Sequence, residues 1–141
     1  MKTKLTLLFL VTASFFVNAQ NTEACTETLS LMSTSVKAKD ASAYDYLTTL
    51  RKDCPSFHKS IYTLGEFAVK MKIEKATTPQ DKEKYVRDLL KLYDEHDQYF
   101  PGNGAGNKMK KGLALFENKV GTSDEIFNLL DVAFKTDRKS T

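Results

Sequence analysis

The chain has 141 residues, 41% of them hydrophobic and 28% charged, which suits one globular domain or part of one. Its formal net charge is +3, from 21 basic and 18 acidic residues. Removal of an N-terminal leader with two lysines lowers it to +1. A charge so near zero, without a basic block, argues against the electrostatic surface by which proteins bind nucleic acid.

Residues 1–19 predict a secretory signal peptide. Two lysines form a basic start, an apolar stretch follows, and Val17 and Ala19 occupy the −3 and −1 positions of a cleavage site. The apolar run is too short for a typical membrane span. We therefore expect a periplasmic, outer-membrane-associated or secreted protein without a transmembrane segment after cleavage behind Ala19. An uncleaved anchor, or a lipoprotein modified at Cys25, is the alternative.

Residues 20–141 predict an all-α domain. Apolar residues recur at steps of three and four, and no stretch alternates apolar and polar residues over six positions as a strand would. Short breaks between the helices make successive helices antiparallel hairpins. Six helices are expected, over residues 22–37, 40–52, 56–75, 78–100, 105–119 and from 122 onward.

Two of these helices have clear start signals. Thr78 is suited to cap the fourth helix, and Pro79 takes the first helical position, where its missing N–H costs nothing. Thr122 and Glu125 fit a capping box, in which the hydroxyl and the carboxylate each bind a free backbone N–H. We therefore expect the fourth and sixth helices to begin at these residues.

The two cysteines predict a disulfide. Cys25 falls in the first turn of the first helix and Cys54 at the end of the second. In an antiparallel hairpin these ends are adjacent, so the Cα atoms can reach the distance that a disulfide requires. Export favours the bond, and two buried free thiols are the alternative. A nucleophile–base pair of Cys54 and His58 is less favoured, because Pro55 breaks the helix between them.

The glycine-rich loop Gly102–Lys108 is the strongest candidate for an enzyme site, and a hydrolase or nucleotide-binding enzyme that uses it is the alternative function. A P-loop needs a glycine and a hydroxyl where this chain has Asn107 and Met109. Such loops also follow a strand, whereas a long amphipathic helix precedes this one. We expect a turn between helices, with an anion at the next helix N-terminus as the alternative.

No catalytic residue, metal site or cofactor is expected. Residues 94–97 are acidic or histidine, but consecutive helical side chains point about 100° apart and cannot converge on one ion. Most aromatic residues fall on the apolar helix stripes and predict core. Tyr44 and Tyr46 are exceptions, because they lie on different sides of the second helix. They are the candidates for contact with a partner.

The helix pairs carry marks of a repeat. The first and third helices start 34 residues apart, which is the tetratricopeptide period. Ala43, Leu47 and Pro55 match the spacing of that repeat's second helix, and Gly65 that of its first. Three segments resemble a family of exported tetratricopeptide-like (TPR-like) helical-repeat proteins of Bacteroidetes-type bacteria, mostly uncharacterised: LRKDCPSFHKSIYTLGE, KEKYVRDLLKLYDEHDQYFPG and KVGTSDEIFNLLDVAFKTDR. The resemblance implies antiparallel helical hairpins stacked as a short α-solenoid, and it supplies no substrate and no active site.

A helical repeat leaves one curved face free for a ligand. We therefore expect a binding or scaffold module for a protein or peptide partner in the bacterial envelope, and not an enzyme. An open alternative is that the chain forms the N-terminal part of a longer solenoid. The last helix presents apolar residues on more than one side, and solenoids normally end in a polar capping helix.

Overall fold

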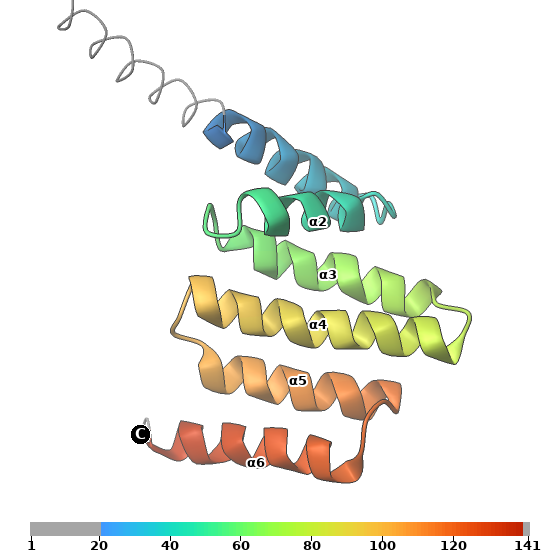
Figure 1. The fold of residues 1–141 in the computed structure, drawn as a ribbon, viewed down its shortest axis with the longest axis vertical. Helices are drawn as coiled ribbons and strands as arrows, with labels where there is room; N and C mark the ends of the chain where they lie inside the picture. Colours follow the sequence, from blue (N-terminus) through green and yellow to red (C-terminus); the bar gives the residue numbers. More distant parts are fainter. Residues whose placement is uncertain (1–20, 140–141) are drawn as a thin grey trace, which may run out of the picture.

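The computed structural model describes residues 21–139, so the expected leader and its cleavage site at Ala19 lie outside the described residues. Within this range the chain forms helices and no strand (Figure 1), which confirms the all-α class. The first helix covers residues 21–37. Five more follow: α2 (Ala43–Asp53), α3 (Ser60–Lys75), α4 (Pro79–Tyr99), α5 (Gly104–Asn118) and α6 (Ser123–Lys139).

The helices run back and forth, and from α2 to α6 each packs against the next in chain order (Figure 1). Side chains also join helices that are two apart in the chain. The joining ion pairs are Arg51–Glu95 between α2 and α4, Glu66–Lys110 between α3 and α5, and Arg87–Glu125 between α4 and α6. The α3 and α5 helices therefore approach each other on one side of α4.

The start of α4 follows the prediction. The Oγ1 atom of Thr78 accepts a hydrogen bond from the backbone N of Asp81 at 3.1 Å, and Pro79 is the first helical residue. The Oγ1 atom of Thr122 likewise accepts from the backbone N of Glu125 at 3.2 Å, before α6. Both contacts satisfy backbone donors that have no partner inside the helix.

The second and third helices begin later than the sequence predicts. Asp40 lies in a turn before α2, where its Oδ1 atom accepts a hydrogen bond from the backbone N of Ser42 at 2.8 Å. Aspartate favours such turns because its carboxylate competes for backbone N–H groups. Before α3, the backbone N of Phe57 donates to the carbonyl O of Cys54 at 3.0 Å, which extends the turn that follows α2.

The core lies between the first helix and α2 to α5. Gly65 lets α2 and α3 approach closely, because a Cβ atom there would lie 2.7 Å from Cδ1 of Leu47. By contrast, α6 contributes one fully buried side chain, Ala133. None of the described helices is long and apolar enough to cross a membrane. The largest fully buried core side chains are Tyr62, Met32, Leu47, Leu50, Ile61, Leu89, Leu92, Leu115, Val69 and Val86.

Candidate functional site

The disulfide is present as predicted. The sulfur atoms of Cys25 and Cys54 are 1.95 Å apart and their Cα atoms 6.1 Å apart. The bond joins the first helix to the end of α2. Because Cys54 has no free thiol, it cannot act as a nucleophile with His58. The Nδ1 atom of His58 accepts a hydrogen bond from the backbone N of Ser60 at 3.1 Å, at the start of α3.

A turn joins α4 to α5, as predicted, and a helix rather than a strand precedes it. The turn is shorter than the Gly102–Lys108 segment, because α5 begins at Gly104 and residues 104–108 belong to its first turns. Gly102 has a φ of 132°, which glycine adopts without strain. Two of the lysines that follow are held by carboxylates of neighbouring helices, which directs their charge away from the loop. Lys110 donates to Glu66 and Lys111 to Asp94, each at 2.7 Å.

Asn107 fills the position at which a P-loop needs a glycine. Its side chain is buried, and its Nδ2 atom donates to Oδ1 of Asp97 at 2.6 Å. A Cβ atom at Gly106 would also lie 2.6 Å from Oδ1 of Asn103. The Asn107–Asp97 contact holds the start of α5 against α4.

The side chains of residues 94–97, at the end of α4, contact different neighbours within the chain. The ring of His96 stacks on Tyr62, with centroids 5.4 Å apart and planes 6° apart. Glu95 binds Arg51 of α2, and Asp97 binds α5. Among the described residues, no group of three or more His, Cys, Asp or Glu side chains could hold a metal ion.

Tyr44 and Tyr46, the predicted partner contacts, are both half-buried. The hydroxyl of Tyr44 donates to Oδ2 of Asp88 at 2.8 Å, and its ring meets Tyr85 edge-on at 5.6 Å. Burial, followed by the bond to Asp88, raises the pKa of Tyr44 well above its ordinary value. Tyr46 packs against the core. Both rings therefore serve the fold, and their contact with a partner stays a prediction.

Arg51 forms a polar cluster between α2 and α4. Its guanidinium binds Asp88 at 2.9 Å and Glu95 at 2.7 Å, and only 12% of its side chain is exposed. Burial acts to lower the pKa of Arg51, but the hydrogen bonds that its guanidinium donates to Glu95 and Asp88 outweigh it, so the pKa is raised. A hollow of about 320 Å³ lies beside the cluster. Because two carboxylates already neutralise the cation, the cluster joins the helices and offers no anion site.

The surface shared by α3 and α5 is the strongest candidate for a partner site. Phe67 of α3 is 59% exposed and lies one turn before Lys70 on the same helix face. Lys70 in turn lines a hollow of about 240 Å³, which we call the α3–α5 groove. Its floor is apolar and buried, formed by Ile73, Leu89 and Ala114, and its rim is charged, formed by Lys70, Glu74 and Glu117.

Sequence reasoning missed this surface. The expected apolar stripe of the third helix passes through Ile61, Leu64, Ala68 and Met71, and Phe67 lies three residues after Leu64 and four before Met71. Helix periodicity therefore places Phe67 beside the stripe and gives no sign that it is exposed. In the structure Phe67 is exposed because the buried side of α3 is formed by other residues: Ile61, Tyr62, Gly65, Ala68, Val69 and Ile73.

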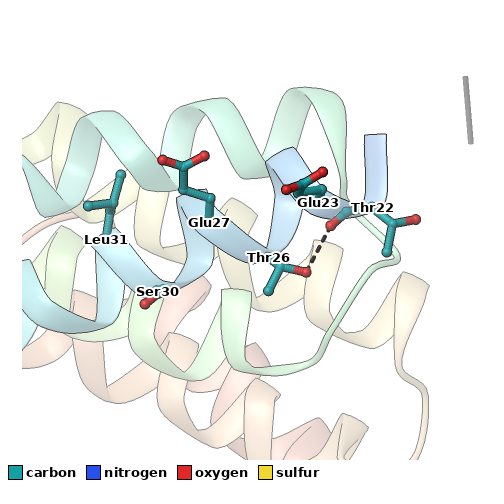
Figure 2. Close-up of a pocket in the computed structure, with 6 residues that line it drawn as sticks. All are labelled: Thr22, Glu23, Thr26, Glu27, Ser30 and Leu31. Carbon is teal, nitrogen blue, oxygen red and sulfur yellow. Dashed lines mark hydrogen bonds between the residues drawn. The ribbon is translucent and has the colours of Figure 1, made fainter. Parts of the chain in front are cut away.

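A third hollow lies along the first helix (Figure 2). Its described lining comes from this helix alone: Thr22, Glu23, Thr26, Glu27, Ser30 and Leu31. The hydroxyl of Thr26 donates to the carbonyl O of Thr22 at 2.8 Å, inside the same helix. The surface of a single helix is convex, so these residues by themselves do not enclose a ligand.

No family model, curated protein or solved structure matches this chain. The surfaces described above are therefore the basis on which a function can be proposed.

Proposed function

We propose that this protein is an exported helical-repeat module that binds a protein or peptide partner in the bacterial envelope. The exposed ring of Phe67, one helical turn before Lys70 at the rim of the α3–α5 groove, is the observation that carries the proposal. Binding surfaces commonly combine an aromatic anchor, an apolar floor and a polar rim. All three lie together on α3 and α5.

The proposal includes a short TPR-like α-solenoid. It is supported by the antiparallel order of consecutive helices and by ion pairs between helices two apart in the chain. Stacked hairpins make both kinds of contact, because alternate helices form one layer. In that arrangement α3 and α5 belong to the same layer, and the α3–α5 groove opens on its surface.

The charge of the rim indicates what the partner carries. Lys70 is already held by Glu66 at 2.7 Å. Glu74 and Glu117 add negative charge on the two sides of the groove. A partner segment with one apolar side chain for the floor and a basic neighbour for the rim fits this surface. The expected leader would export the module to the envelope, where it could bind a protein that carries such a segment.

The test is capture of proteins from an envelope extract by the immobilised protein, with quantification by mass spectrometry. Phe67→Asp is expected to lower specific capture at least about tenfold, because it places a charge at the anchor. Leu31→Asp is the control, since Leu31 of the first helix is also an exposed apolar residue, at 43%, and does not line the groove. Equal capture by wild type and Phe67→Asp would overturn the proposal. Micromolar, magnesium-dependent ATP binding lost on Lys108→Ala would favour the enzyme alternative.

A further inference from the structure

The α5 helix has one open side, and that side is apolar. Its other sides are occupied by contacts to α3, α4 and α6, made by Lys110, Asn107 and Gly112. Met109, Leu113 and Phe116 recur at steps of four and three, so they line one helix face. All three are exposed.

The apolar side of α5 continues onto α6. A Cβ atom at Gly112 would lie 2.6 Å from Cδ2 of Leu130, so the two helices are in close contact at this point. On α6, Leu130 lies between Phe127 and Phe134 at steps of three and four. Phe127 is 67% exposed and Phe134 57%. We call the joint surface the α5–α6 face: Met109, Leu113, Phe116, Phe127, Leu130 and Phe134.

The size of this face matches what a stable dimer requires. Its three phenylalanines are each more than half exposed, and together present roughly 300–450 Å² of apolar surface. With the aliphatic residues the total approaches roughly 500 Å². A standard homodimer interface takes about 800 Å² from each partner, of which about 65% is apolar. The apolar part of such an interface is therefore about 500 Å² from each partner, which is about the apolar area that this face exposes.

We propose that a second copy of this chain covers the α5–α6 face, so that the protein is a symmetric dimer. The six residues of the face are all apolar, and the guanidinium of Arg138, which lies over the ring of Phe134 at 5.7 Å, is near the end of α6. A copy can therefore cover the centre of the face without burying a charge. Its two antiparallel helices and those of the copy form a four-helix arrangement. Because the contact is between identical surfaces, it closes after two subunits.

Charges at the edge of α5 make the face complementary to itself. Lys110 precedes Leu113 by three residues and Glu117 follows it by four. When α5 packs antiparallel against its copy about Leu113, Lys110 of each chain lies opposite Glu117 of the other. Symmetry repeats this pair on both sides of the centre. The near-neutral net charge of the chain adds little repulsion between the copies.

The oligomeric state tests the proposal. The full chain is expressed, purified as the cell processes it, and measured by sedimentation across the micromolar range. Wild type is expected to be a dimer, and Phe116→Asp is expected to weaken dimerisation at least about 30-fold. Phe67→Asp, an equally exposed phenylalanine outside the face, is expected to remain a dimer. A monomeric wild type, or equal dissociation of both variants, would overturn the proposal.

A charge reversal separates the interface from the fold. Lys110→Glu is expected to weaken the dimer, because it places two glutamates opposite each other, and adding Glu117→Lys is expected to restore it. Lys110 also binds Glu66 within its own chain, and the second substitution does not repair that contact. Circular dichroism verifies that both variants are folded. Failure of the double variant to recover dimerisation would contradict the proposed register.

Discussion

The two ends of the described chain are held in different ways. The first helix is joined to α2 by a disulfide, and α2 is joined to α4 by the Arg51 cluster. At the other end, α6 buries Ala133, packs Ile126 and Leu129 partly against the core, and leaves Phe127 and Phe134 exposed. Covalent and polar contacts thus stabilise the first region, whereas the second retains apolar surface that its own chain does not cover. We infer that stability is concentrated in the first region and association in the second.

The largest expected effect concerns the disulfide. Replacing Cys25 and Cys54 by serine should lower the free energy of unfolding by about 3.5 kcal/mol, because the unfolded chain regains the freedom of a loop with a sequence separation of 29. Urea unfolding of the wild type and the double variant measures the difference. Wild type unfolded in the presence of a reductant should match the variant. A loss below about 1 kcal/mol would show that the packing of the first helix does not depend on the bond.

The next effect compares two arginines. Arg51→Ala leaves two largely buried carboxylates without their cation, and should cost about 2–3 kcal/mol in unfolding free energy. Arg87→Ala removes an ion pair with Glu125 whose side chains are 41% and 35% exposed, and should cost less than about 1 kcal/mol. Thermal and urea unfolding of the two variants test this order. Equal losses would mean that the α2–α4 and α4–α6 ion pairs contribute equally to the unfolding free energy. Stability would then not be concentrated in the first region.

Local signals in the sequence predicted helix starts along the chain and the disulfide of the first region. The proline after Thr78 and the hydroxyl of Thr122 mark helix starts that the structure confirms. The hairpin formed by the first two helices placed Cys25 beside Cys54. These inferences succeed because each depends on residues near in sequence, or on a single helix reversal.

Contacts between distant helices could not be predicted in this way. Arg51 meets its carboxylates 37 and 44 residues further along the chain, and the sequence gives no register for α2 against α4. The exposure of Phe67 likewise depends on which side of α3 is covered by the helices that pack against it. The late start of α2 has a local cause, the turn at Asp40, but helix periodicity does not reveal it.

The smallest expected effect is a pH dependence at Glu66, which joins the two regions. Burial acts to raise the pKa of this carboxyl, but hydrogen bonds from Lys110 and Lys70 outweigh it, so the pKa lies below the ordinary 4.5. A lowered pKa means that the ionised form stabilises the fold above pH 4.5, and that this contribution is lost as the pH falls through the folded-state value.

Glu66→Gln should therefore lower the unfolding free energy at neutral pH by about 1 kcal/mol or less, because both lysines are half-exposed. Below pH 4.5 the difference from wild type should shrink, since protonation removes the same charge in the wild type. Urea unfolding at a series of pH values measures it. Glu74→Gln, on the exposed side of the same helix, controls for the loss of one carboxylate. If wild type and Glu66→Gln gave parallel curves down to acid pH, the ion pairs of Glu66 would add nothing to the junction of α3 and α5.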